Sequence, residues 1–202
     1  MRFTKMQGIG NDYIYVNCFE EKVDDPEKVS IKVSDRHFGI GGDGLVLIMP
    51  SEKADFRMRM FNADGSEGMM CGNATRCIGK YVYDNKLTDK TEITLETKSG
   101  IKYLTLHPEN GVVKTVDVDM GEPILVPKDI PMLAKGDSFI NKPIDVNGKS
   151  VNITAVSMGN PHAVVFTSKI DGLDLEKIGP DYENDPILPE RVNTEFCEIL
   201  DG

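Results

Sequence analysis

"NADGSEGMMCGNATRC", residues 62–77, connects a strand-like segment to a helix-like one, and this connection decides how the surrounding chain folds. The preceding residues 54–61, "ADFRMRMF", alternate apolar and basic side chains, which predicts a strand. Four residues recur afterwards at helical spacing: Cys77, Ile78, Tyr81 and Val82. We therefore expect a strand, a glycine-rich turn and a helix that begins at or near Cys71.

Further segments on both sides of this turn have clear periodicity. A helix is predicted to open at Asp25, with Pro26 in its first position, and to close before Gly39. The strand-like segments are "YIYVN" (13–17), "GLVLIM" (44–49), "TEITLET" (91–97), "IKYLTLH" (101–107) and "GVVKTVDVDM" (111–120). The last three are separated by turn signals, as in an antiparallel sheet. The expected fold class is α/β, an α+β mixed sheet around one central helix.

The composition changes near residue 119, where prolines begin to punctuate the chain. We place a domain boundary there, which predicts an N-terminal domain at 1–118 and a second domain at 119–202. The second domain is predicted to contain strands at 150–158 and 162–168, a short broken helix at 174–185, and a final strand at 194–200.

The two halves resemble each other, which indicates a duplicated domain. "GNDYIYV" and "GNPHAVV" share a Gly-Asn turn before a strand, and their asparagines, Asn11 and Asn160, are 149 positions apart. A weaker match pairs Asp43 with Asn193, at an offset of 150. On this repeat, the counterpart of Cys71 would lie near roughly position 220, which this sequence does not contain.

Charge and cysteine usage exclude several classes of protein. The 202-residue chain has a net charge of -10 and a pI of about 4.8, which argues against nucleic acid and anionic membranes as partners. No apolar run is long enough for a signal peptide or a membrane span, so we expect a cytoplasmic protein. The four cysteines are too scattered to predict a disulfide framework or a metal site.

Cys71 stands where local chemistry permits a reactive thiol. The unpaired N–H groups and the dipole at a helix start stabilise negative charge, so a thiolate can form there. The N–H groups of Gly72 and Asn73 suit a substrate carboxylate, and Asn62 and Asn73 add amide donors. A buried hydrophobe, or a turn needed only for backbone conformation, remains the alternative from the residues alone.

A base beside a carboxylate-binding site is what proton abstraction from the α carbon of an amino acid requires. We find no phosphate loop and no Schiff-base lysine context, so we expect no pyridoxal phosphate and no other cofactor. Inversion of the carbon centre then needs an acid on the opposite face. A duplicated domain with a second cysteine at a similar helix start would supply it.

The other candidate residues keep a structural interpretation beside the functional one. Three cysteines in apolar strands or helix faces are interpreted as packing residues: Cys18, Cys77 and Cys197. His162, between a proline and a strand, is a packed or capping residue or a functional one, and Asn11 and Asn160 are turn formers or ligands. "GIGGDG" (39–44) precedes a strand and lacks the spacing of a dinucleotide loop, so we interpret it as a turn.

Five stretches together resemble the diaminopimelate epimerase family: "FTKMQGIGNDY", "DRHFGIGGDG", "MRMFNADGSEGMMCGNATRC", "VSMGNPHAVVF" and "RVNTEF". They cover essentially the whole chain in the family's order, and the cysteine block is highly specific. The resemblance implies a cofactor-independent isomerase of lysine and peptidoglycan precursor biosynthesis. Such an enzyme interconverts LL- and meso-2,6-diaminopimelate through a thiolate and a thiol. The implied fold is two similar α/β domains with the substrate between them.

The resemblance also implies roles for individual residues. Cys71 resembles one of the two catalytic cysteines, and Gly72 and Asn73 match backbone and amide contacts to the substrate. His162 resembles a histidine that supports catalysis without being the base that transfers the proton. The remaining substrate-binding positions match Asn11, Asn62, Asn160 and Asn193.

The sequence departs from the family pattern at its end. The family continues into approximately Arg-Gly-x-Gly-Glu-Thr and Ala-Cys-Gly-Thr-Gly, which carry the second cysteine, whereas this sequence stops at "CEILDG". Cys197 is no substitute, because it follows Asn193 in a predicted strand and has no glycine-flanked helix start. We therefore expect a C-terminally truncated epimerase with an incomplete second domain. Gly44 stands where the family often has a polar side chain, so it is assigned no contact.

Three alternatives remain beside this interpretation. A proline racemase-like isomerase uses similar cysteine chemistry on a cyclic substrate. A non-catalytic fragment would bind an amino acid without turning it over, and one half of a split protein would need a complementary chain. For the epimerase interpretation we expect a small-molecule partner, diaminopimelate, and a homodimer is compatible with it.

Overall fold

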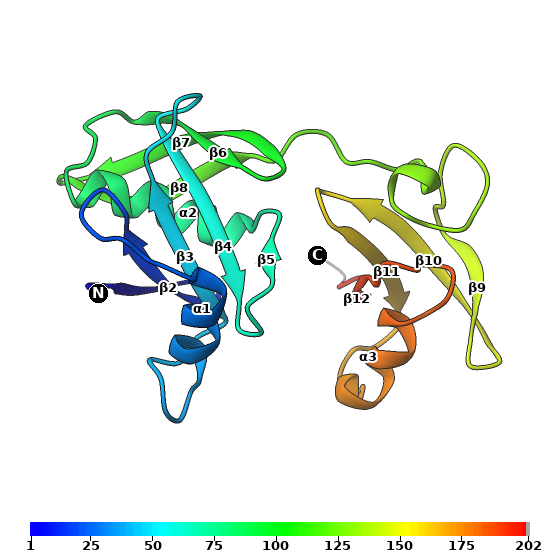
Figure 1. Cartoon of the computed structure of the whole chain (residues 1–202). Coiled ribbons are helices and arrows are strands. Elements are labelled where there is room, and N and C mark those ends of the chain that lie inside the picture. The colour runs from blue at the N-terminus through cyan, green and yellow to red at the C-terminus, as the bar shows by residue number, and fades with distance from the viewer. Residues whose placement is uncertain (201–202) are drawn as a thin grey trace. The chain divides into compact units, whose positions relative to one another are not determined.

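The computed structural model describes residues 1–200 and divides the chain into two units, Met1–Met120 and Gly121–Gly202 (Figure 1). The division lies two residues after the boundary expected from composition, between residues 118 and 119. Each unit has a hydrophobic core of its own, so the two are described separately.

The first unit is built on an eight-stranded mixed sheet in the order β1-β2-β3-β4-β6-β7-β8, with β5 paired to β4. The pairs β2–β3 and β4–β6 are parallel, and all other neighbours are antiparallel. The strands are β1 (Thr4–Gly8), β2 (Asn11–Asn17), β3 (Gly44–Met49), β4 (Phe56–Asn62), β5 (Glu67–Gly68), β6 (Glu92–Thr97), β7 (Gly100–Glu109) and β8 (Val112–Asp119).

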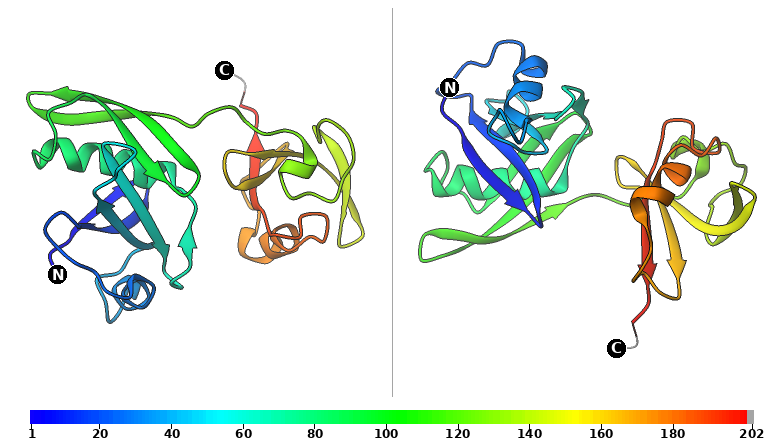
Figure 2. Two further views of the ribbon diagram at one scale, coloured as in Figure 1. Left: turned by 45° about the horizontal axis from the view of Figure 1, so that its top comes forward. Right: turned by 90° about the horizontal axis from the view of Figure 1, so that it is seen from below.

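The helix α2 (Gly72–Asp84) is the central helix of this unit. It contacts β1 and β8, the strands at the two ends of the sheet, and also β7, so the sheet curves around the helix (Figure 2). One face of α2 is fully buried, and it includes Ala74, Ile78 and Val82. This burial explains the helical spacing of apolar residues in the sequence.

Successive side chains of β2 and β3 point to opposite faces of the sheet. Tyr15 and Val46 pack in the core beside α2, whereas Ile14 and Leu45 pack in a second core. Helix α1 (Pro26–Ser34) covers that second face through Val29 and Val33. The two strands are buried on both faces, which explains why their sequences are continuous apolar runs.

The second unit is built on a four-stranded sheet in the order β12-β11-β10-β9. Its strands are β9 (Lys142–Val146), β10 (Lys149–Ser157), β11 (Pro161–Thr167) and β12 (Asn193–Glu198). The neighbours β9, β10 and β11 pair antiparallel, and β11 and β12 pair parallel. A 3-10 turn, η1 (Pro127–Asp129), precedes the sheet, and the helix α3 (Leu175–Glu183) connects β11 to β12.

The two units repeat one motif, an antiparallel hairpin followed by a helix and a parallel third strand. In the first unit the motif is β1-β2-α1-β3, and in the second it is β10-β11-α3-β12. Helices α1 and α3 begin and end 149 residues apart, and so do strands β3 and β12. The weaker sequence match was therefore misaligned by one position: Asn193 corresponds to Gly44 and not to Asp43.

Several predicted boundaries were wrong. The first helix ends at Ser34 and does not extend to Gly39, because the Asp35 carboxylate accepts the His37 and Phe38 N–H groups and forms a turn. Asp25 precedes the helix but makes no side-chain capping bond. Helix α3 is continuous through Pro180 and is not broken. Strands β1, β5 and β9 were not predicted.

Within residues 1–200, the structure contains no helix that is both long enough and apolar enough to cross a membrane.

Candidate active site

Cys71 is the N-cap residue of α2, with φ -138° and ψ 118°. The first carbonyl of the helix is its own, and this carbonyl accepts the Thr75 N–H at 2.9 Å. The N–H groups of Gly72 and Asn73 lie in the first turn of the helix, where no earlier helical carbonyl can accept their hydrogen bonds. The Cys71 side chain makes no capping bond and is half-buried. The sulfur therefore lies beside the positive end of the helix dipole.

Asn11, at the start of β2, brings the Cys71 and Asn73 side chains together. The Cys71 Sγ atom donates to Asn11 Oδ1 at 3.4 Å, and Asn73 Nδ2 donates to the same oxygen at 3.4 Å. The Asn73 Oδ1 atom accepts a short hydrogen bond from Arg76. Three of the predicted residues thus form one group, although Asn11 lies sixty residues before Cys71.

Asp43 lies behind Asn11 and was not predicted as a site residue. Its Oδ2 atom accepts from Asn11 Nδ2 at 2.6 Å and from the Asp12 N–H at 3.1 Å. Its Oδ1 atom accepts from Arg36 at 2.9 Å, and Arg36 also donates to both carboxylate oxygens of Asp12. The "GIGGDG" stretch contained this residue, but its sequence signal was only that of a turn.

That turn is closely packed against β2. A side chain at Gly42 would meet the Asp12 carbonyl oxygen at 3.1 Å, and Gly41 has φ +79°. A Cβ atom at Gly44 would lie 2.0 Å from the carbonyl oxygen of Phe61. The glycines therefore allow the chain to approach the neighbouring strands and to deliver Asp43 to Asn11. The stretch precedes a strand, as predicted.

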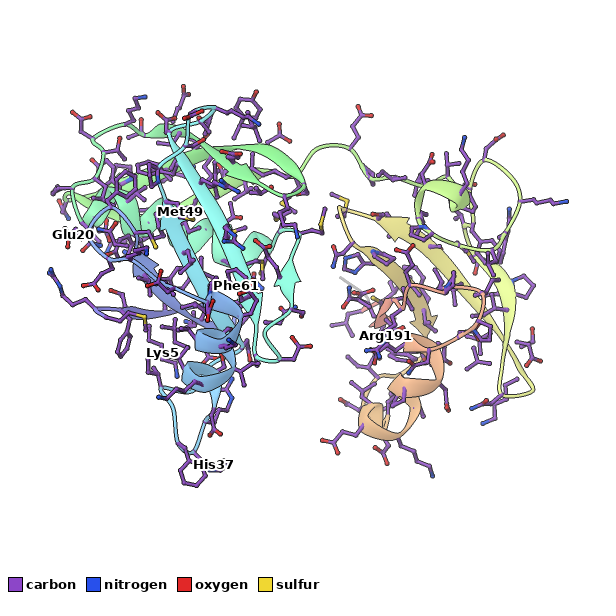
Figure 3. All side chains as sticks on the ribbon, viewed as in Figure 1. Lys5, Glu20, His37, Met49, Phe61 and Arg191 are labelled. Atoms are coloured by element: carbon purple, nitrogen blue, oxygen red, sulfur yellow. The ribbon has the colours of Figure 1, made fainter. Side chains whose placement is uncertain are left out.

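Asn62 lies at the same end of the sheet, because β4 ends where β3 begins. It stands opposite Gly44, which itself stands opposite Tyr13 in β2. Its Nδ2 atom donates to Ser66 Oγ at 2.9 Å, and Ser30 in α1 donates to its carbonyl at 2.8 Å. Phe61, the residue before it, is labelled in Figure 3. The Asn62 amide thus belongs to the same sheet end, but it bonds to its own turn.

Two buried tyrosines line the strands beneath the cysteine. Burial, together with the neighbouring Cys71 sulfur, raises the pKa of Tyr13 to about 12. Burial and the neighbouring Cys77 also raise the pKa of Tyr15. Burial raises the pKa of the Cys77 thiol as well, although Tyr15 opposes this shift. These phenols stay protonated at neutral pH and bring no charge to the site.

The predicted residues of the second unit gather at the start of β11 and β12. His162 pairs with Asn193 across these parallel strands. The His162 Nδ1 atom lies 2.7 Å from Glu195 Oε1, and Nε2 lies 3.0 Å from Asn160 Oδ1. Asn193 is exposed, and its Nδ2 atom donates to the Pro161 carbonyl at 3.3 Å. Glu195 was not predicted, because a single glutamate in a strand has no specific sequence signal.

A cavity of about 560 Å³ opens beside these residues in the second unit, and β12 and the preceding loop contribute most of its lining. Asn193 and Glu195 are part of this lining, together with Arg191, which Figure 3 labels. The second Glu195 oxygen, Oε2, and the Thr194 hydroxyl are buried without a hydrogen-bond partner in the described chain.

The other cysteines lie in different surroundings. Cys77 is buried inside α2, and Cys18 and Cys197 are half-buried. Among the cysteines of residues 1–200, only Cys71 stands at the start of a helix. In the same part of the chain, no three histidine, cysteine or acidic side chains gather closely enough to hold a metal ion.

Comparison with solved structures shows which fold the chain has. The chain superimposes on a hydroxyproline epimerase from Agrobacterium vitis with a TM-score of 0.58, and on a probable proline racemase from Agrobacterium radiobacter with a TM-score of 0.62. Sequence identity is 13% and 14%, and each match covers 88% of this chain and 52% of the other. The chain therefore shares the fold of these two proteins.

Sequence comparison identifies the family. A family model for diaminopimelate epimerase matches residues 3–126. Diaminopimelate epimerase of Agathobacter rectalis is 62% identical over 99% of this chain, and that of Acetivibrio thermocellus is 60% identical over all of it. The chain covers 73% and 72% of these two relatives. It belongs to the diaminopimelate epimerase family and is an isomerase.

Proposed function

We propose that this chain carries the first half of the catalytic machinery that interconverts LL- and meso-2,6-diaminopimelate. We propose this substrate because the matching family and the relatives are named for it. Identity of 62% to a diaminopimelate epimerase, against 13% to a hydroxyproline epimerase, favours an acyclic diamino acid over a cyclic one. The reaction belongs to lysine and peptidoglycan precursor biosynthesis in the cytoplasm, and a homodimer is compatible with it.

The observation that carries this proposal is the position of Cys71 at the start of α2. The sulfur is half-buried and lies beside Asn11 and Asn73, and the free N–H groups of Gly72 and Asn73 are close in the chain. These N–H groups suit the substrate carboxylate, because a helix start binds anions. A base and a carboxylate site then adjoin each other, as α-proton abstraction requires.

The proposed step at Cys71 is a proton transfer without a cofactor. The Cys71 thiolate takes the α proton, so the C–H bond breaks and an S–H bond forms. The electron pair passes into the substrate carboxylate as an enediolate, which the helix N–H groups stabilise. A second acid then protonates the α carbon on its opposite face, and the centre is inverted.

The second acid, in this proposal, comes from outside residues 1–200. Cys77 is 6% exposed inside a helix, so it cannot reach a substrate. Cys18 follows β2 and Cys197 lies within β12, so neither has the N–H groups of a helix start. The relatives are longer than the matched part of this chain, which leaves room for such a group.

The residues of the second unit bind the substrate in this proposal. Asn160 and Asn193 supply amide groups, and His162 supports catalysis without transferring the proton. The hydrogen bonds of His162 to Glu195 and Asn160 occupy both ring nitrogens, which suits a fixed supporting group better than a mobile base. Asn62 supplies a further amide in the first unit.

Deuterium incorporation tests the proposal. The purified chain is incubated in deuterated water with LL-diaminopimelate, alone and with a peptide of the relatives' additional C-terminal residues. NMR follows deuterium at the α carbon, and chiral chromatography follows inversion. We expect inversion only when the second acid is present, and we expect it to disappear in Cys71→Ala.

Two control variants sharpen this experiment. Cys18→Ala should retain the activity, and Cys77→Ala should retain it after a loss of stability of about 1 kcal/mol from the small cavity. Inversion by Cys71→Ala, or an equal loss of inversion activity in Cys71→Ala and Cys18→Ala, would refute the assignment of Cys71 as the base. Binding of diaminopimelate without any exchange in either mixture would instead favour a non-catalytic amino-acid-binding protein.

A further inference from the structure

We propose that Asp43 is a positioning residue, which orients the side-chain amide of Asn11 so that its oxygen faces Cys71. The chemical meaning of this orientation rests on the proposed function of Cys71, but the orientation itself does not.

The Asp43 carboxylate decides which way the Asn11 amide points. An ionised carboxylate only accepts hydrogen bonds, and the side-chain amide of asparagine has one donor and one acceptor end. Asn11 Nδ2 lies 2.6 Å from Asp43 Oδ2, which is a short bond to a charged acceptor. The reverse orientation would place two oxygens at this distance, so it is excluded.

The orientation set by Asp43 also fits the other end of the amide. Asn11 Oδ1 then faces two donors, the Cys71 thiol and Asn73 Nδ2, each at 3.4 Å. In the reverse orientation Asn11 Nδ2 would face Asn73 Nδ2, donor against donor. The hydrogen bonds on both sides of Asn11 therefore support one orientation.

Asp43 is itself held in place from several directions. It accepts the Asp12 N–H at 3.1 Å and an Arg36 N–H at 2.9 Å, and its own N–H donates to the Asp12 carbonyl at 2.6 Å. Its turn packs closely against β2 at Gly42. Because the backbone and the side chain are both fixed, the position of the carboxylate is fixed as well.

This arrangement has a consequence for the proton on Cys71. The Asn11 oxygen accepts the S–H group, so it holds the thiol proton in one direction. If Asn11 were free to rotate, its Nδ2 could face the sulfur and donate to a thiolate. Asp43 thereby makes the neighbour of the sulfur an acceptor, and it controls how readily the thiol proton leaves.

NMR on the isotopically labelled, unsubstituted chain tests the orientation directly. A scalar coupling across the hydrogen bond from Asn11 Nδ2 to the Asp43 carboxylate carbon is expected, with slow solvent exchange of the Asn11 amide protons. Absence of this coupling in the folded chain would overturn the proposal. This measurement needs no substrate, so it stays decisive if the chain shows no proton exchange.

Asp43→Ala tests the consequence at the sulfur, because alanine has no acceptor for the Asn11 amide, and Asp12→Ala is the matched control for charge. Asp43→Ala should increase the rate of Cys71 alkylation by iodoacetamide about two- to tenfold, the range of one hydrogen bond between neutral groups. Asp12→Ala should change this rate less than twofold and should leave the Asn11 amide signals in place. An equal increase in both variants, or no increase in Asp43→Ala, would overturn the proposal. If Asp43→Ala does not fold, the coupling in the unsubstituted chain decides.

Discussion

His162 and Glu195 are hydrogen-bonded across the two parallel strands of the second unit, with Nδ1 of the ring 2.7 Å from Oε1 of the carboxylate. The other ring nitrogen lies 3.0 Å from Asn160 Oδ1. Glu195 faces Val164 in the strand register, two residues beyond the position of His162. The two side chains therefore lie on the same face of the sheet, as alternate residues do.

Removal of the Glu195 carboxylate should release the His162 ring. In Glu195→Ala we expect the ¹⁵N chemical shift of Nδ1 to move towards that of a free imidazole, because its acceptor is lost. Where activity is measurable, kcat should fall about tenfold, the effect of one hydrogen bond to a charged group. Glu190→Ala, an exposed residue of the same cavity, is the control. Identical ring spectra in both variants would contradict this role.

The four cysteines should differ in their rates of alkylation. We expect iodoacetamide to modify Cys71 well before Cys77, because Cys77 is 6% exposed and burial raises the pKa of its thiol. Cys18 should also react slowly, because burial raises the pKa of its thiol too. Peptide mass spectrometry over time measures the order. Modification of Cys77 first would contradict the packing of α2.

Gly44 should not tolerate a side chain. In Gly44→Ala the added Cβ would meet the Phe61 carbonyl oxygen at 2.0 Å, so β3 and β4 would have to separate. We expect a loss of about 2–3 kcal/mol in the free energy of unfolding, measured by urea titration. Gly179→Ala is the control, because its Cβ would meet open space within α3. That variant should be stabilised by about 0.5–1 kcal/mol. An unchanged free energy of unfolding in Gly44→Ala would contradict the close spacing of β3 and β4.

Acid should weaken the hydrogen bonds around Asp12. The Arg36 guanidinium lowers the pKa of Asp12 from 3.8 to about 2, so the folded state favours its ionised form. This contribution to stability is fully present above about pH 4, and it disappears as the pH falls to about 2. Asp12→Asn should therefore lose less stability than the unsubstituted chain between pH 5 and 2. Asp24→Asn, at an exposed carboxylate paired with Lys22, should lose as much as the unsubstituted chain.

Local patterns in the sequence predicted the elements that are buried on both faces. The bounds of β3 agree with the apolar run at 44–49, and α2 begins directly after Cys71, as expected. A continuous apolar run between turn residues has few alternatives to a buried strand. Strand β1 was missed because its burial is slight and it lies at the sheet edge, where few apolar side chains mark it.

The family, the duplicated motif and the helix start at Cys71 could be predicted from the sequence, because motifs and periodicity are local properties of the chain. The hydrogen bonds from Asp43 to Asn11 and from Glu195 to His162 could not be predicted and are seen only in the folded structure. These pairs are separated by 32 and 33 residues, and the parallel register of β2–β3 and β11–β12 brings them together. Parallel strands pair through a crossover connection, so their register depends on packing of the whole unit and leaves no local sequence signal.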